Sequence, residues 1–268
     1  MTISRRKIIT VAGGKKYTTN AYASIKLLRH LGCDLPVDWF YINEQEMPEK
    51  WLVAASIPGV QCINLKLNEK QHNGKSLGGW QAKIEAILAT DADEVLYLDA
   101  DNFVWRDPEY LFNSDLFKEY GAILWKDVTD WEKERIKGLE RYFGVAPKHK
   151  SQAESGQLLF DKRRCLKALE KVREYNVTSE ETYKVVYGDK DTFYFGLLTT
   201  DTPFAFINRR PSCGKGCLLQ HDMYDDILFT HLTGGKWSLN GRPFTDESSL
   251  PYLNRCRGFI EELRKQLL

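Results

Sequence analysis

The sequence predicts an α/β fold in which a mostly parallel central sheet is flanked by helices. Short apolar runs alternate with amphipathic stretches through residues 8–112, an order typical of parallel strands joined by crossover helices. No repeat, low-complexity tract or linker interrupts the chain, which favours a single domain over residues 1–268. In such sheets, ligands bind beyond the carboxyl ends of the strands, so polar residues at those ends are the first candidates for function.

The first part of the chain reads as four strands separated by three helices. Residues 8–12 (IITVA) are an apolar run that enters a glycine turn, which indicates a buried strand. Apolar residues at helical spacing between Ala21 and Leu31 predict a helix that Gly32 ends. The same criteria predict further strands at 37–42, 60–67 and 94–101, helices at 47–56 and 80–90, and a loop at 73–79.

The remainder of the chain continues the mixture of strands and helices. Asp107 and Pro108 open a short helix at 108–112. The runs GAILW and SGQLLFD predict strands, and the periodicity of CLKALEKVREYN predicts an amphipathic helix. Helices are also expected at 131–142, over 179–198 and at the C-terminus from Leu253, with FAFIN, a glycine–cysteine loop and ILFTHLTGGKW between the last two.

Composition excludes several classes of protein. Hydrophobic residues make up 43% and charged residues 28%, which are ordinary globular values. The net charge of +1 does not indicate nucleic acid or a charged membrane surface as a partner. No apolar run is long enough to span a membrane, and the N-terminal run is too short for a signal peptide. A soluble, cytoplasmic protein is therefore expected.

The six cysteines are expected to be free thiols, because no secretion signal precedes them. The segment CGKGC, from Cys213 to Cys217, is followed by His221 and could form a C-x3-C-x3-H metal site. The alternative is a loop that turns on Gly214 and Gly216, and this spacing fits no common zinc pattern well.

The triplet Asp-Ala-Asp occurs twice, at 91–93 and at 99–101. The first copy lies in a polar turn between a helix and a strand, where its carboxylates are expected to face water. The second copy follows the apolar run VLYL, so Asp99 and Asp101 are expected at the carboxyl end of a strand and on the same side of it. They could bind Mn²⁺ or Mg²⁺, which prefer oxygen ligands; the alternative is that they cap the turn.

The chain also resembles a known family. Four segments occur in the order found in the yeast-type mannan-branching α-mannosyltransferases: GGKKYTTNAYASIKLLRHLGCDLPVDWFY, WQAKIEAILATDADEVLYLDADNFVWRDPEYLF, AESGQLLFDK and YGDKDTF. The resemblance implies a single-domain A-type glycosyltransferase fold, similar in layout to glycogenin and the retaining galactosyltransferases. It also implies a nucleotide-sugar half at about 1–110 and an acceptor-side half at about 111–268. Members are usually Golgi enzymes with an N-terminal anchor, so the Golgi lumen is the alternative location.

The resemblance implies a metal-dependent, retaining transfer of a hexose to a sugar hydroxyl of a glycan acceptor. The expected donor is GDP-mannose. A UDP-sugar is the alternative, because FTHLTGGKW resembles the late segment of glycogenin-like enzymes. By that resemblance His231 joins Asp99 and Asp101 as a metal ligand, and Lys236 binds phosphate. Gly234 and its neighbour Gly235 would allow close approach of the backbone.

The other site residues are expected around the donor. Asp191, Asp189 and Glu154 are the candidate catalytic residues, placed to bind donor hydroxyls or stabilise an oxocarbenium-like transition state. Asp189 could instead be a helix cap. Two further sets complete the prediction: Ser155 and Gln157 as donors near the anomeric centre, and Gly13, Gly14, Tyr17 and Lys83 against the nucleotide, its phosphates or the sugar, although Lys83 could be a solvated helix lysine.

Aromatic residues between 125 and 150 are expected near the acceptor, because aromatic faces stack on sugar rings. They are Trp125, Trp131, Tyr142 and Phe143.

Two other classes of protein remain as alternatives. A haloacid-dehalogenase-type phosphatase also carries Asp-x-Asp after a buried strand, but normally after the first strand. A non-catalytic sugar-binding protein on the same fold would tolerate loss of the acidic pairs, all of which are present here.

Overall fold

The computed structural model describes residues 4–67, 71–72, 75–76 and 79–268. The loop expected at 73–79 falls mostly outside these residues. Among the described helices, none has the length and apolar character needed to cross a membrane.

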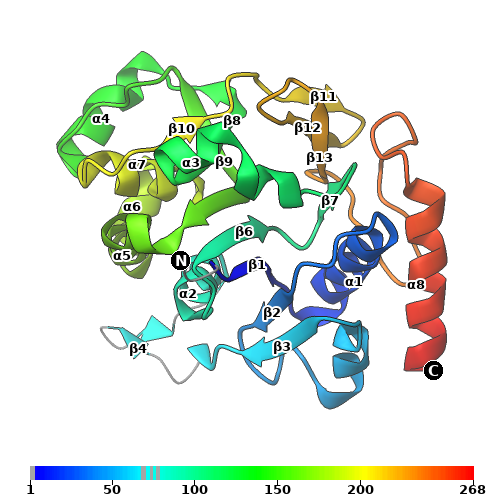
Figure 1. Cartoon of the computed structure of the whole chain (residues 1–268). Coiled ribbons are helices and arrows are strands. Elements are labelled where there is room, and N and C mark those ends of the chain that lie inside the picture. The colour runs from blue at the N-terminus through cyan, green and yellow to red at the C-terminus, as the bar shows by residue number, and fades with distance from the viewer. Residues whose placement is uncertain (1–3, 68–70, 73–74, 77–78) are drawn as a thin grey trace.

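A seven-stranded sheet forms the centre of the molecule, in the order β10-β8-β9-β6-β1-β2-β3 (Figure 1). Only β9 runs antiparallel to its neighbours β6 and β8, and the other pairs are parallel, which confirms the mostly parallel sheet. The strands are β1 Arg6–Val11, β2 Val37–Tyr41, β3 Val60–Asn64, β6 Glu94–Leu98, β8 Ala122–Asp130, β9 Ser151–Asp161 and β10 Ala205–Phe206.

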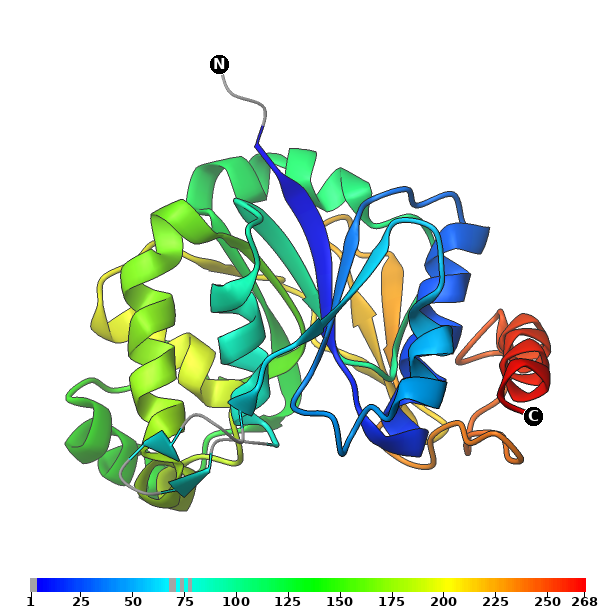
Figure 2. The same ribbon diagram turned by 90° about the horizontal axis from the view of Figure 1, so that it is seen from below.

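Helices cover both faces of this sheet (Figure 2). On one face α1 (Gly14–His30) packs against α8 (Leu253–Leu267) and the 3-10 helix η1 (Glu49–Ala55). The other face is covered by α2 (Gln81–Ala89), α4 (Lys133–Phe143), α5 (Lys162–Val177), α6 (Ser179–Val185) and α7 (Lys190–Thr199). A further 3-10 helix, η3 (Glu109–Asn113), and α3 (Asp115–Tyr120) precede β8.

Alternation along the strands explains why two cores form. Successive side chains of a strand point to opposite faces of a sheet. Leu96 and Leu98 of β6 accordingly lie in the cluster with α1 and α8, whereas Val95 and Tyr97 lie in the cluster with α2 and α5. The central strands are buried on both faces, and for this reason they read as continuous apolar runs.

A second, four-stranded sheet has the order β11-β12-β13-β7 and joins distant parts of the chain. Its strands are β7 Asn102–Val104, β11 Ser212–Gly214, β12 Cys217–His221 and β13 Ile227–His231. The strand expected at 94–101 therefore ends at Leu98, because the chain turns at the second Asp-Ala-Asp triplet and enters this other sheet. The short strands β4 (Gln71–His72) and β5 (Lys75–Ser76) pair with each other.

The segment CGKGC forms a hairpin between β11 and β12. Gly214 pairs with Cys217, and Gly216 adopts a φ of 68° in the turn. Cys213 is exposed while Cys217 is buried, and all six cysteines are free. The chain turns here on Gly216, as expected, whereas Gly214 belongs to the strand, and in the described chain these residues do not gather as metal ligands.

Two helical regions and one additional helix also differ from the sequence prediction. Helix α1 begins at Gly14 and therefore includes the polar residues KKYTTN. Within this polar stretch, Thr18, Thr19 and Asn20 are buried. The helical region at 179–198 is broken before Asp189, where Gly188 has a φ of 66°. Helix α3 is unexpected from periodicity, since it is one turn and a half held by its caps, Ser114 and Gly121.

The aromatic residues expected near the acceptor are mostly core residues, and that prediction is wrong for three of the four. Trp125 is fully buried and its indole N–H donates to the carbonyl of His221 at 2.7 Å. Phe143 stacks on Phe195 with ring centroids 3.9 Å apart, and Trp131 is also buried beside Phe195. Tyr142 is half-buried and its hydroxyl bonds to Thr182. These aromatic rings therefore contribute mainly to the packing of the core.

Candidate active site

The second Asp-Ala-Asp triplet is held at the junction of the two sheets. The backbone N–H of Asp99 donates to the carbonyl of Gly156 on β9 at 2.8 Å. The carbonyl of Asp101 accepts from the N–H of Leu232, just after β13, at 3.1 Å. Asp99 is therefore fixed to the large sheet and Asp101 to the small one.

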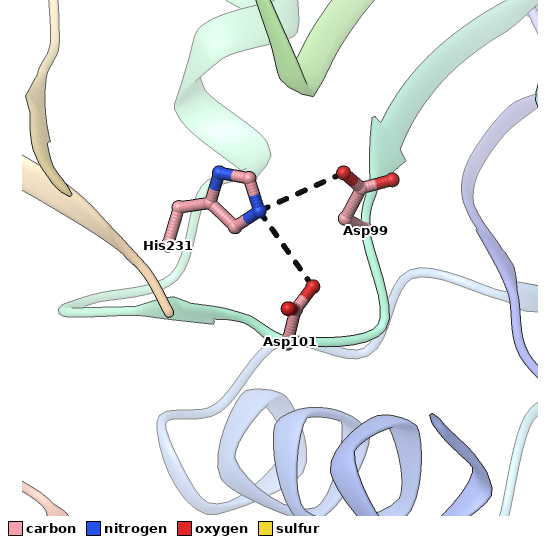
Figure 3. Close-up of side chains that lie close together, drawn as sticks. All are labelled: Asp99, Asp101 and His231. Carbon is pink, nitrogen blue, oxygen red and sulfur yellow. Dashed lines mark ion pairs between the residues drawn. The ribbon is translucent and has the colours of Figure 1, made fainter. Parts of the chain in front are cut away.

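His231 completes a cluster of three possible metal ligands. It ends β13, directly opposite Asn102 of β7. Its Nε2 lies 3.7 Å from a carboxylate oxygen of Asp99 and 3.7 Å from one of Asp101, and all three side chains converge (Figure 3). The ligand atoms of the three residues lie within 4.8 Å of one another. Two carboxylates and an imidazole suit Mn²⁺ or Mg²⁺, so this donor set fits the predicted metal.

Gly156, between β9 residues Ser155 and Gln157, makes room for the histidine. A Cβ at this position would lie 2.6 Å from Nδ1 of His231 and 3.0 Å from Oε1 of Glu154. Real atoms do not approach so closely, so any side chain here would displace the imidazole. The glycine of AESGQ is thus part of the site, a role that the motif alone did not indicate.

Glu154 contacts the other nitrogen of the same imidazole. Its Oε1 lies 3.2 Å from Nδ1 of His231 and accepts the N–H of Gly156 at 2.8 Å. Burial alone would raise the pKa of Glu154, but His231, Gly156 and Lys83 lower it to about 2. Burial opposes charge on His231, yet Glu154 and Asp99 raise its pKa above the ordinary value. A carboxylate on Nδ1 leaves Nε2 facing the two aspartates.

Lys83 is a buried cation between two acidic groups. Its Nζ lies 3.2 Å from Asp99 and 3.1 Å from Asp189, and it donates to the hydroxyl of Ser155 at 2.8 Å. Burial favours the neutral amine, but Asp189 and Asp99 raise the pKa of Lys83 to about 12. The solvated-lysine alternative is wrong, because the side chain is buried.

Lys236 forms the corresponding ion pair with Asp101. Its Nζ also donates to the carbonyl of Leu232 at 2.9 Å. Burial lowers the pKa of Lys236 to about 8, partly opposed by Asp99. Asp101 is only 3% exposed, so a nearby positive charge is needed to compensate its burial.

A pocket with a volume of about 340 Å³ opens beside this cluster, along the carboxyl ends of β1 and β6. Of the residues predicted to bind ligand or metal, seven line it: Gly13, Tyr17, Lys83, Asp99, Asp101, His231 and Lys236. Tyr97, which sequence reasoning missed, also lines it and donates its hydroxyl to Asp99 at 2.9 Å. The pocket therefore places residues predicted to bind the nucleotide next to those predicted to bind the metal.

The candidate catalytic aspartates do not line the pocket. Asp189 occupies the N-cap position of α7, but its side chain makes no capping bond and pairs with Lys83 instead. Burial raises the pKa of Asp189, and Lys83 opposes the shift. Asp191 is completely buried and accepts the N–H of Ala153 on β9 at 2.8 Å. Burial raises the pKa of Asp191 to about 7, with Lys190 opposing.

Three predicted residues do not line the pocket and instead hold neighbouring segments together. Gln157 is buried and accepts from the amide of Asn102 at 2.7 Å. Gly234 donates its N–H to Gly216 at 2.9 Å, which fastens the loop after β13 to the β11–β12 turn. Gly14 begins α1 with a φ of 67° and donates to the carbonyl of Glu46 at 2.5 Å.

Glu46 and Trp80 also line the pocket and were not predicted, because no motif in the sequence marks them. Glu46 follows β2 in a polar loop, and Trp80 precedes α2 with its side chain 54% exposed. Each belongs to a segment that reaches the pocket only through the order of the strands.

Comparison with known proteins agrees with this geometry. The profile of the mannosyltransferase family Mannosyl_trans3 matches residues 6–144 and 135–213. The alpha-1,2-mannosyltransferase MNN21 of Candida albicans is 30% identical over 249 residues, covering 72% of this chain and 37% of the relative. Its relative MNN2 from the same organism is 37% identical over 122 residues, covering 44% and 20%. The chain thus spans less than half of the length of these relatives.

Two solved structures resemble the chain in fold. The galactosyltransferase LgtC, solved with donor and acceptor sugar analogues, has a TM-score of 0.53 at 17% identity, covering 97% of this chain and 99% of that one. The glycosyltransferase GlyE of Streptococcus pneumoniae TIGR4 has a TM-score of 0.50 at 20% identity, covering 76% and 45%. The fold is that of the A-type glycosyltransferases. Because the family profile matches most of its length, this chain belongs to the mannosyltransferase family Mannosyl_trans3.

Proposed function

We propose that this chain transfers mannose from GDP-mannose to a sugar hydroxyl of a glycan acceptor, in a reaction that depends on Mn²⁺ or Mg²⁺. The observation that carries the proposal is the convergence of Asp99, Asp101 and His231 beside the pocket. The names of the relatives, alpha-1,2-mannosyltransferases, support mannose as the sugar. A UDP-sugar is the alternative donor, and the galactosyltransferase of similar fold keeps that alternative open to test.

The metal ligands would be Asp99, Asp101 and His231. A bound Mn²⁺ supplies a Lewis acid that neutralises charge on a diphosphate leaving group. Lys236 lines the same pocket and would contribute a further positive charge to the diphosphate. In doing so it would exchange its contact with Asp101 for one with phosphate.

Glu154 and Asp189 would position the groups that touch the donor. Glu154 holds His231 through Nδ1, and Asp189 holds the ammonium of Lys83, which lines the pocket. Direct contact of Glu154, Asp189 or Asp191 with the donor sugar stays a prediction. Whether a carboxylate nucleophile or a same-face displacement gives retention is part of that prediction.

We also propose that the chain works as one catalytic domain. Asp101 and His231 belong to segments of the second sheet, while Asp99 ends a strand of the first. A site built across both sheets requires both to fold together. The location, in the cytoplasm or the Golgi lumen, stays a prediction.

The test is a donor screen with the purified chain. GDP-mannose, other GDP-sugars and UDP-sugars are incubated with Mn²⁺ and a mannoside acceptor, and released nucleoside diphosphate and extended glycan are measured. We expect release and extension with GDP-mannose, and neither after chelation of the metal. Turnover of a generic phosphate ester without any use of sugar nucleotides would favour the phosphatase alternative, and binding of a sugar nucleotide without transfer would favour the sugar-binding alternative.

A further inference from the structure

The pocket extends over three neighbouring strands, and its two ends differ in chemistry. Strands β6, β1 and β2 are adjacent in the sheet, and Asp99 follows β6 while Glu46 lies in the loop after β2. Strands β6 and β2 are two strand spacings, about 10 Å, apart, and the pocket spans the loops that follow both. With the diphosphate at the Asp99 end, the base would lie at the Glu46 end.

Glu46 is the acidic residue of the lining that lacks a cation. The other two acidic lining residues, Asp99 and Asp101, are paired with Lys83 and Lys236. Within the described part of the chain, no ion pair involves Glu46. Burial raises the pKa of Glu46, and the N–H of Ile42 is the group that lowers it. A half-buried carboxylate in this position favours a ligand that donates hydrogen bonds.

The glycine turn before α1 fixes this carboxylate in place. A Cβ on Gly13 would lie 2.4 Å from Oε2 and 2.6 Å from Cβ of Glu46. The N–H of Gly14 bonds to the carbonyl of the same glutamate. The two glycines predicted to contact the nucleotide therefore have another role: they leave space for Glu46 in the lining of the pocket.

We propose that Glu46 selects guanine as the base of the sugar-nucleotide donor, an inference that rests on the function proposed above. Guanine carries two adjacent donors on one edge, the ring N1–H and the 2-amino group, which match the two oxygens of a carboxylate. Uracil offers a single ring N–H between two carbonyl oxygens, which a carboxylate repels. Adenine lacks a ring N–H on that edge altogether. The apolar side chains of Val11 and Ile42 line the same end and would contact the base.

The experiment measures binding of nucleoside diphosphates without any transfer. Calorimetry with Mn²⁺ compares GDP, IDP and UDP for the wild-type chain and for Glu46→Gln. IDP differs from GDP only by the missing 2-amino group. We expect the wild type to bind GDP about ten-fold to a hundred-fold more tightly than IDP, the range for one hydrogen bond to a charged group. In Glu46→Gln, the difference between GDP and IDP should shrink to about two-fold.

Two further variants separate the role of Glu46 from general damage. Glu44→Gln changes an exposed carboxylate of the same loop and should keep the wild-type preference. Gly13→Ala should displace Glu46 and reproduce the loss of preference. If Glu46→Gln does not fold, the comparison of GDP with IDP on the wild type decides: affinities within two-fold would overturn the proposal.

The outcomes also separate this inference from the proposed function. Mn²⁺-dependent binding of UDP in preference to GDP would overturn the role of Glu46 and leave a glycosyltransferase. A full GDP preference retained in Glu46→Gln would do the same. Binding of no nucleoside diphosphate in the presence of Mn²⁺ would overturn both.

Discussion

The two Asp-Ala-Asp triplets have the same sequence and different surroundings. Asp91 of the first copy is 60% exposed and pairs with Arg5 and Lys7 at the surface. Asp93 accepts the backbone N–H of Arg5 at 2.9 Å, so this copy fastens the start of β1 to the turn before β6. The second copy lies at the opposite end of β6, where Asp101 is buried.

The difference shows that position in the sheet, and not the triplet, makes the site. The end of β6 that carries the second copy meets β9 and the second sheet, which brings His231 to the carboxylates. Buried Lys83 from α2 and half-buried Lys236 pair with the same carboxylates. The end that carries the first copy meets the N-terminal segment with Arg5 and Lys7 and the start of α5, where the N–H of Lys162 donates to the carbonyl of Asp93 at 2.8 Å. The expectation that the first pair faces water is confirmed for Asp91, whose side chain is 60% exposed, but Asp93 is only 22% exposed and accepts the N–H of Arg5.

The largest expected effect comes from exchanging a carboxylate in the second copy. Asp101→Asn removes a charged ligand and should lower Mn²⁺-dependent transfer by at least about a hundred-fold. Mn²⁺ titration by calorimetry should show the same loss in affinity. Circular dichroism and melting serve as controls for folding, and near-wild-type transfer by a folded variant would contradict the metal assignment.

Glu154→Gln should have the next largest effect. It keeps the size of the side chain but weakens the hold on His231, so Mn²⁺ affinity should fall about ten-fold to a hundred-fold, the range for partners of metal ligands. A matched control is Glu44→Gln, which changes an exposed carboxylate of the loop after β2. Unchanged Mn²⁺ affinity in Glu154→Gln would show that the contact does not position the ligand.

Asp191→Asn extends the comparison to a carboxylate that is completely buried. The raised pKa of Asp191, about 7 compared with 3.8, means that the folded chain holds the proton more tightly than the unfolded chain. Stability contributed by this proton is present below pH 4 and is lost as the pH rises to 7. The melting temperature of the wild type should therefore fall relative to the variant between pH 5 and pH 8. A pH-independent difference would contradict the shift.

The smallest effect is expected from Asp91→Asn in the first copy. Exposed ion pairs contribute little to stability, so the melting temperature should change by no more than about 2 °C. Transfer and Mn²⁺ affinity should remain those of the wild type. A loss of either would mean that the two triplets are not as different in function as their surroundings indicate.

Much of the fold and of the metal cluster could be predicted from the sequence, because the signals for them are local. The apolar run before Asp99 predicted a strand end, and the alternation of strands and helices predicted the parallel sheet. What could not be predicted depends on pairing between distant segments. The antiparallel β9 places Gly156 beside His231, and the loop after β2 places Glu46 beside Gly13. Trp125 and Phe143 were misplaced because the sequence of a helix or strand does not distinguish a ring in the core from one at a site.

The register between β7 and β13 determines whether the metal ligands still have to be brought together when a cation binds. Bringing Asp101 and His231 together would carry a large chain-entropy cost if they met only when a cation arrived. The bond from Leu232 to Asp101 places them together in the folded chain already. The site is thus preorganised, unlike small zinc domains in which metal uptake and folding are one event. Treatment with a chelator should accordingly abolish catalysis while the far-ultraviolet circular dichroism of the chain stays as it was.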